Sequence, residues 1–406
     1  MRPIFRTLSY RNFRLFYIGN GISLIGTWMQ QVAMSWLVYR LTGSPVLLGL
    51  IAFAGLFPGF VFAPLAGVLS DRWSRFHILL VVEILALLQA AVLAVLVLAD
   101  LVSVGHIVVL SVLLGLINAF DIPARQALVV ELIENREDLG NAIALNSALF
   151  NGARLIGPSL AGITIALVGE GICFVLNALS YLAVIATLLI MKIETPPRPA
   201  SISNIAQELK AGLSYTLGSV PIRSLIMLIS LVSLMGMPYS VLLPIFAKDV
   251  FHGGPHTLGF LTAASGAGSM IAALYLASRL SLAGMGRTVP LAACLFGVSL
   301  ILFSLTKTLW LSLIFLMLAG YGGMVQFAIS NTILQTLVDD DMRGRVLSFF
   351  AMSFMGAMPL GSLLAGILAG IIGAPTTLMI GGLCCITGAL LYALKLPRQR
   401  NIVDSQ

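Results

Sequence analysis

The stretch Thr42–Leu50 reads TGSPVLLGL, and a related stretch, HGGPHTLGF, occupies His252–Phe260, 210 positions further along the chain. A second pair of segments supports the match, because Gly115–Gly162 resembles Gly320–Gly366 about 205 positions later. This spacing divides the chain into two similar halves. Repeats of this length, built from apolar segments, indicate a duplicated membrane bundle with a functional site between the two repeats.

The composition identifies lipid as the solvent for most side chains. The chain has 406 residues, of which 59% are hydrophobic and only 10% are charged, and its mean hydropathy is +1.03. A soluble domain could not bury that much apolar surface. Apolar runs of about 20 residues can cross a bilayer. Twelve such runs are predicted: 15–39, 46–70, 77–99, 104–128, 140–168, 170–191, 222–247, 256–280, 288–306, 309–336, 345–372 and 376–395.

Lys and Arg are distributed unevenly over the connections between these segments. Eighteen of the 23 lie in the two tails and in the connections that follow even-numbered segments. Three lie on the other side (Arg40, Lys248 and Lys307), and Arg125 and Arg154 fall inside segments. Because basic connections stay in the cytoplasm, this asymmetry predicts that both termini are cytoplasmic. It also explains the net charge of +7 without a nucleic-acid partner.

One long polar connection separates the two halves. Prolines within 196–199 end the sixth segment. Ile205, Leu209 and Leu213 then recur every four residues, which predicts a short amphipathic helix on the cytoplasmic surface. We therefore expect three parts: an N-terminal six-helix bundle at 1–191, a cytoplasmic linker with this helix at 192–220, and a C-terminal six-helix bundle at 221–406. The expected fold is an all-α membrane protein with twelve transmembrane helices and pseudo-two-fold symmetry.

Missing motifs exclude several classes of chemistry. The chain has no G-x-x-x-x-G-K-[ST] loop, no H-E-x-x-H and no G-x-S-x-G, which argues against an ATPase, a zinc protease or a serine hydrolase. Its four cysteines all lie in apolar segments, without the spacing of a metal or redox site. The first segment lacks a small-residue cleavage site, so we expect it to be a retained anchor. We expect no enzyme activity, no cofactor and no metal.

The connection after the second segment reads GVLSDRWSRF at Gly67–Phe76. It resembles the signature loop of the major facilitator superfamily, G-x-L-a-D-r-x-G-r-r. The matching residues are Gly67, Leu69, Asp71, Arg72 and Arg75, whereas Ser74 and Phe76 depart from the pattern. The resemblance implies a cytoplasmic gate, in which Gly67 lets helices approach closely and Asp71 forms and breaks contacts with a neighbouring helix. The alternative is a solvated loop whose arginines only set the topology.

The fifth segment carries GPSLAG at Gly157–Gly162. This is similar to the G-P-x-x-G-G core of a motif associated with proton antiporters of the same superfamily, although Ala161 and Ala153 replace two of its glycines. The resemblance assigns Gly157 and Pro158 to an element that shapes and seals the bundle during export. A kinked helix with a small-residue packing face is the alternative.

Further local matches cover nearly the whole chain. They are similar to the bacterial branch that contains the enterobactin exporter and related drug efflux proteins, which implies a location in the bacterial inner membrane. The matching stretches are Asn12–Phe16, Thr42–Pro45, Asp121–Ala127, Asn141–Ala142, Asn146–Ser147 and Arg343–Val346.

Ionisable residues inside apolar segments need a partner or a watery cavity, because a charge in lipid is costly. Glu83, Asp121 and Arg125 lie at similar depths near the cytoplasmic side, and Asp121 and Arg125 have the favourable i, i+4 spacing of an ion pair. Together with Asp71 and Arg75 they are predicted to form one network. The network is a permanent clamp, a gate that opens in each cycle, or a proton carrier.

Arg154 lies near the middle of the fifth segment, and no acidic residue in the neighbouring sequence matches its depth. Its counterpart in the second half is near Met358, so the fold does not require a charge there. An unpaired guanidinium suits an anionic group of a substrate. The alternative is that Arg154 snorkels or bonds to backbone carbonyls. Asn151, one turn earlier, is assigned to the same site.

In the major facilitator superfamily the first, fourth, seventh and tenth segments line a central cavity, and the resemblance implies the same arrangement here. Amide, aromatic and methionine side chains in the middle of these segments suit a bulky amphipathic ligand. The candidates for substrate binding are Gln30, Gln31, Met34, Asn118, Tyr239, Tyr321 and Gln326.

These observations predict a secondary active transporter that works by alternating access. The leading interpretation is a monomeric, proton-coupled exporter of siderophore-like or drug-like amphipathic molecules, with the proton gradient as its energy source. A nutrient importer and a lipid flippase on the same scaffold are the alternatives. The expected partners are a small-molecule substrate, protons and the lipid bilayer.

Overall fold

Helices account for all regular structure in the part of the chain that the structure describes. The computed structural model describes residues 3–133, 135–191, 205–278 and 285–403. Its elements, in chain order, are η1 (Pro3–Ser9), α1 (Arg11–Thr42), α2 (Pro45–Arg72), α3 (Arg75–Leu98), α4 (Val104–Glu131), η2 (Arg136–Asp138), α5 (Leu139–Val168), α6 (Glu170–Ile190), α7 (Ile205–Gly218), α8 (Val220–Leu231), η3 (Val232–Gly236), α9 (Tyr239–Ile245), η4 (Phe246–Val250), α10 (Pro255–Ser278), α11 (Met285–Leu305), α12 (Leu309–Leu337), α13 (Asp340–Ile372) and α14 (Ala374–Val403).

Each predicted apolar segment corresponds to helical structure, and eleven of the described segments are long and apolar enough to cross a membrane. The twelfth, α1, has 32 residues, which at about 1.5 Å per residue is ample length. It differs from the other eleven because polar side chains such as Asn20, Gln30 and Gln31 interrupt its apolar sequence. Since α1 packs against α5 and α6, we assign it to the same bundle.

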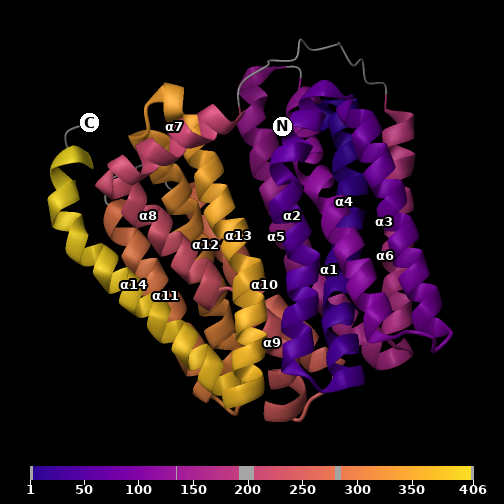
Figure 1. Cartoon of the computed structure of the whole chain (residues 1–406). Helices are drawn as coiled ribbons and strands as arrows, with labels where there is room; N and C mark the ends of the chain where they lie inside the picture. Colours follow the sequence, from indigo (N-terminus) through magenta and orange to yellow (C-terminus); the bar gives the residue numbers. More distant parts are fainter. Residues whose placement is uncertain (1–2, 134, 192–204, 279–284, 404–406) are drawn as a thin grey trace.

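The seventh segment is not a single regular helix. It runs from α8 to η4, and both η3 and η4 are wider π-helical turns. Pro238 and Pro244 lie between these turns. A proline cannot donate the backbone hydrogen bond of a regular helix, so the backbone readjusts around it. This irregular segment lies between the two halves, where Figure 1 shows α9 beside α1 and α10.

The two halves repeat one packing pattern, which establishes the pseudo-two-fold arrangement. In the first half α2 packs on α4, and α3 packs on both α4 and α6. In the second half α10 packs on α12, and α11 packs on both α12 and α14. The halves meet through two equivalent pairs of helices, α5 with α10 and α13 with α2. Figure 1 shows the halves as an indigo-to-magenta bundle and an orange-to-yellow bundle.

The glycines of the sequence repeat lie at these two contacts between the halves. A Cβ placed on Gly49 of α2 would lie 2.9 Å from the Cα of Gly366 in α13. A Cβ on Gly162 of α5 would lie 3.1 Å from the Cα of Gly259 in α10. Gly49 and Gly259 are equivalent positions of the repeat, as are Gly162 and Gly366. The repeat therefore preserves the small residues that let the halves approach closely.

Replacing Gly162 should separate the halves. Gly162→Val places a branched side chain against the backbone of α10, and overpacking of this kind costs about 1–3 kcal/mol. Gly140 lies in the same helix, and a Cβ added there would meet nothing within 4 Å, so Gly140→Val is the matched control. Thermal unfolding of the purified proteins in detergent should show a lower Tm for Gly162→Val only. Equal Tm values for the two variants would contradict the contact.

The ends of the helices define two sides of the molecule. The termini side carries η1, α7 and the last turns of α14, and the opposite side carries the turns between α1 and α2 and between α5 and α6 (Figure 1). α7 covers the residues where the linker helix is expected, and it is attached to the second half because Tyr215 Oη donates to Asp339 Oδ2 at 2.9 Å. The rest of the predicted linker, 192–204, lies outside the described residues.

Candidate functional site

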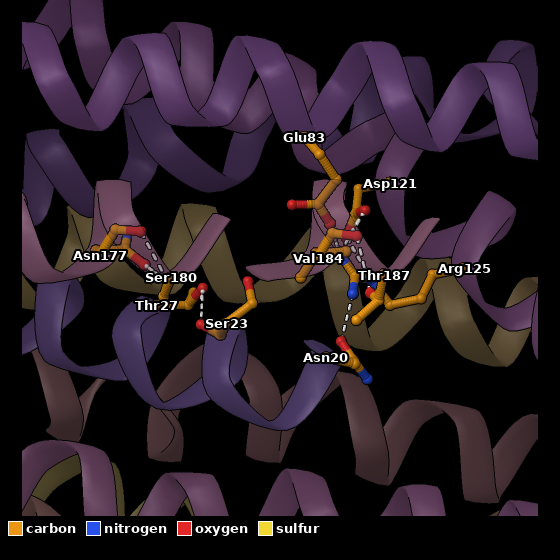
Figure 2. Close-up of polar contacts among 10 residues, drawn as sticks. All are labelled: Asn20, Ser23, Thr27, Glu83, Asp121, Arg125, Asn177, Ser180, Val184 and Thr187. Atoms are coloured by element: carbon orange, nitrogen blue, oxygen red, sulfur yellow. Dashed lines mark hydrogen bonds and ion pairs between the residues drawn. The ribbon is translucent and has the colours of Figure 1, made fainter. Parts of the chain in front are cut away.

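A buried ion cluster joins three helices of the first half. Arg125 of α4 donates to both carboxylate oxygens of Asp121, at 3.0 Å from Nε and 2.8 Å from Nη2. Its Nη2 also donates to Glu83 of α3, and its Nη1 donates to Asn20 of α1. Figure 2 shows the guanidinium between the two carboxyl groups and the Asn20 amide. We call these four residues the ion cluster.

Local helix geometry places the two residues from α4 together. Asp121 and Arg125 are one turn apart, so their side chains lie on the same face of the helix. Pro123, between them, leaves the carbonyl of Ala119 without its helical donor and allows α4 to bend at this point. Glu83 lies about two turns into α3, and Arg125 lies about two turns before the end of α4. The ion cluster is therefore near the termini side.

The charges of the ion cluster do not balance. Glu83 and Asn20 are each 1% exposed, whereas the side chains of Asp121 and Arg125 are each 17% exposed, so the cluster is buried on its Glu83 side. Two carboxyl groups share one guanidinium, which leaves one negative charge when both are ionised. Glu83 Oε2 is buried and has no hydrogen-bond partner among the described residues. An uncompensated charge in such a place is costly.

A second polar cluster lies between the halves at mid-depth. Arg154 of α5 donates from Nη1 to Ser269 Oγ at 3.3 Å and from Nη2 to Ser265 Oγ at 3.4 Å, both on α10. Ser265 also bonds to the hydroxyl of Tyr239 in α9. On the other side the Arg154 guanidinium lies over the ring of Trp28 in α1, 5.7 Å from its centroid. We call these five residues the interface cluster.

Contacts on the opposite side hold the halves together there. Tyr39, at the end of α1, donates its hydroxyl to Asp249 in η4, and the Nζ of Lys248 lies 5.4 Å from the centre of the Tyr39 ring. Tyr39 and Asp249 are 210 positions apart, so they occupy equivalent places in the two halves. Each half therefore contributes one partner to a bond beside the pseudo-two-fold axis.

Comparison with known protein families identifies the chain. A model of a family described as transmembrane secretion effector, a branch of the major facilitator superfamily, matches residues 4–405. The chain belongs to this family. It is therefore a membrane transporter and not an enzyme.

Relatives of this secretion-effector family member include characterised transporters of bacteria. The staphyloferrin A transporter of Staphylococcus aureus is 27% identical over 92% of this chain and 94% of its own length. The multidrug efflux pump Tap of Mycolicibacterium fortuitum is 27% identical over 95% of this chain and 93% of its own. Among solved structures, the match to the POT family transporter PepTSo covers 96% of this chain and 98% of that one, with a TM-score of 0.76 and 12% identity, which shows the shared fold.

The structure of this family member brings together three of the five residues predicted to form one network. Glu83, Asp121 and Arg125 are in contact. Arg75 forms an ion pair with Glu131 near the end of α4, at 2.7 Å, and donates to the Ala127 carbonyl at 3.2 Å. Asp71, like Gly67 and Arg72, lies in the last turns of α2, where the side chains are outside the described part of the structure.

Three predicted substrate residues of the secretion-effector chain are buried inside the bundles in the described conformation. Gln30 bonds to Gln89 and Asn177, because an amide inside the bundle must find polar partners. Asn151 donates to the Ser147 carbonyl one turn earlier in α5. Gln326 is 0% exposed, in the core of the second half. Their role in substrate binding stays a prediction.

Most of the other predicted substrate residues of the transporter are at least partly exposed. Gln31 is exposed in the middle of α1, whereas Met34, Asn118, Arg154 and Tyr321 are partly exposed. Tyr239 is buried but belongs to the interface cluster. Sequence reasoning missed Ser265 and Ser269, because the surrounding SGAGS stretch has the pattern of a helix-packing surface. Asn20 was missed as well, since a single asparagine gives no sign of its partner.

The partial antiporter motif of the secretion effector lies where α5 touches two other helices. A Cβ on Gly157 would lie 2.6 Å from the Cβ of Trp28 and 2.9 Å from the carbonyl oxygen of Ile25, so α5 and α1 are in backbone contact there. The Pro158 carbonyl oxygen lies 2.5 Å from a Cβ placed on Gly259 of α10. Gly157 and Pro158 thus pack α5 against the first segment and against the other half.

Proposed function

We propose that this transporter is a proton-coupled exporter of siderophore-like or drug-like amphipathic molecules. The family description and the functions of the relatives support export, because the relatives include a multidrug efflux pump and a macrolide efflux protein of Streptococcus pyogenes. The described chain offers no metal-binding cluster of acidic, histidine or cysteine residues. In this proposal a transmembrane proton gradient supplies the energy.

The observation that carries proton coupling is the ion cluster. It has two carboxyl groups and one guanidinium, and one buried carboxylate oxygen has no partner among the described residues. A proton on Glu83 neutralises the cluster and weakens its hold on Arg125. Removal of that proton restores the full ion pair. Glu83 is therefore the proposed proton carrier, and Asp121 is the residue that keeps Arg125 in place.

The ion cluster can change the contact between the halves because it includes α1. Asn20 joins Arg125 to α1, and the same helix carries Trp28 of the interface cluster and Tyr39 of the contact on the opposite side. When Arg125 shifts between its carboxylate partners, its hydrogen bond to Asn20 breaks or re-forms, and this releases or holds α1. The motif residues Gly67, Asp71, Arg72 and Arg75 act as the gate at the cytoplasmic ends of the same half in this proposal.

The orientation follows from the distribution of basic residues, with the termini side in the cytoplasm of a bacterial inner membrane. Three contacts then join the halves near the outer surface, namely those of Tyr39 with Asp249, Gly49 with Gly366, and Gly162 with Gly259. The described conformation is therefore proposed to be closed to the outside. One chain supplies both halves of the site, so the working unit is proposed to be a monomer.

Cysteine labelling tests this orientation. Two single-cysteine variants are made in a chain whose four native cysteines have been replaced. Asp100→Cys changes a residue between α3 and α4, on the proposed outer side, and Ser74→Cys changes one between α2 and α3, on the proposed inner side. A membrane-impermeant maleimide added to intact cells should label the first variant and leave the second unlabelled until the cells are opened. Labelling of Ser74→Cys in intact cells would show that the orientation is the reverse of the proposed one.

The function is tested by efflux from cells with and without the gene. The panel is ethidium, a radiolabelled macrolide and a radiolabelled siderophore, each loaded into energised cells. We expect the gene to lower the accumulation of at least one compound, and a protonophore to restore that accumulation. Efflux that continues unchanged after the protonophore collapses the gradient would reject proton coupling, and accumulation raised by the gene would favour an importer.

A further inference from the structure

The interface cluster contains a cation that has no counter-ion. Arg154 makes no ion pair with any described residue, and the partners of its two terminal nitrogens are neutral serine hydroxyls. It lies halfway along α5, while Ser265 and Ser269 lie near the middle of α10, so the charge is at the centre of the membrane span. A cation at this depth is costly unless an anion accompanies it during part of the cycle.

The hydrogen bonds that hold Arg154 are weak and replaceable. Their lengths, 3.3 and 3.4 Å, exceed the 2.7–2.9 Å that is typical of a guanidinium with a carboxylate. The serines do not depend on Arg154 for partners of their own. Ser269 Oγ lies 3.1 Å from the Ser265 carbonyl oxygen and 3.2 Å from that of Gly320, and Ser265 Oγ bonds to Tyr239.

The guanidinium also keeps donors that no described residue uses. The Arg154 Nε–H has no acceptor among the described residues, and it is not buried. Arg154 and Trp28 are both partly exposed, and Gln31 is exposed one turn beyond Trp28. Nε and one terminal nitrogen form the planar pair that binds both oxygens of a carboxylate. Trp28 provides an apolar surface next to that pair.

We propose that the interface cluster binds a carboxylate group of the substrate, and that this carboxylate displaces Ser265 and Ser269 from Arg154. The inference rests on the proposed transport function and adds the chemical class of the substrate. Displacement removes the hydrogen bonds that join α5 to α10 at this depth, while the backbone contact of Gly266 with the Arg154 carbonyl remains. Substrate binding thereby loosens the contact along which the halves move.

The test is binding of citrate, a polycarboxylate probe, to the purified full-length protein in lipid nanodiscs by isothermal titration calorimetry. Tetraphenylphosphonium is the apolar cation used for comparison. Arg154→Gln should lower the ratio of citrate affinity to tetraphenylphosphonium affinity by ~10-fold or more, as expected for lost hydrogen bonds to a charged group. Arg154→Lys, which keeps the charge and loses the planar pair, should give an intermediate ratio.

The double variant Ser265→Ala/Ser269→Ala separates a binding site from a structural contact. If a carboxylate must displace the serines, their removal should raise the affinity for citrate severalfold. An equal ratio of affinities in the parent and in folded Arg154→Gln would overturn the anion site, and weaker citrate binding by the serine variant would overturn displacement. These measurements use no proton gradient, so their failure is distinct from failure of proton-driven efflux.

Discussion

Glu83→Gln should abolish proton-driven efflux and leave a folded protein in the membrane. The glutamine carbonyl can still accept the bond from Arg125, so the contact between α3 and α4 is kept. The side chain can no longer gain and lose a proton, and the cluster is held permanently in its neutral form. We expect efflux to fall at least ~10-fold, to the level of cells without the gene, because proton transfer steps contribute factors of this size or more.

The matched control is Glu137→Gln, which removes an exposed carboxylate from the termini side of the same half. Both variants are compared with the parent for efflux of the same compound and for the amount of protein in the membrane. Glu137→Gln should behave as the parent. Undiminished, protonophore-sensitive efflux by Glu83→Gln would show that Glu83 is not the proton carrier.

Arg125→Ala should have the largest effect on stability. It leaves Glu83 and Asp121 close together without their shared cation, and loss of one partner from a buried ion pair costs about 3–5 kcal/mol. We expect a lower Tm, loss of efflux, or both. Asn20 also loses its partner, so the contact of α4 with α1 weakens at the same time.

The second step of this experiment adds Glu83→Gln to Arg125→Ala. Because the new amide removes one of the two unpaired charges, the double variant should recover part of the lost thermal stability. Residues that act independently would instead give additive losses. Additive losses in Tm would show that Glu83 and Arg125 are not energetically coupled.

The parts of the structure that local rules determine could be predicted from sequence. Segment length and hydropathy gave most helix boundaries within about five residues, whereas α14 ends at Val403, eight positions after the predicted 395. The bond between Asp121 and Arg125 follows from their spacing in one helix. The depth of Glu83 could be derived by counting residues along α3 from its start.

The rotation of each helix about its axis could not be predicted. Gln30 and Gln31 are adjacent, yet one bonds inside the bundle and the other is exposed. In lipid both the outer face and the inner face of a helix are apolar, so hydropathy does not distinguish them. The partners of Arg154 lie more than 100 positions away on α10, and only the packing of the two halves brings them together.

The central claim is that a proton on Glu83 drives export, and reconstituted liposomes test it most directly. Purified parent and Glu83→Gln proteins are placed in liposomes with an acidic interior, and uptake is measured for the panel compound that the cells export. Since protons leaving the liposome exchange for substrate in either orientation, the parent should accumulate the compound until the pH difference is dissipated, and Glu83→Gln should not accumulate it. Equal uptake by the two proteins, or uptake by the parent that does not depend on the pH difference, would contradict the claim.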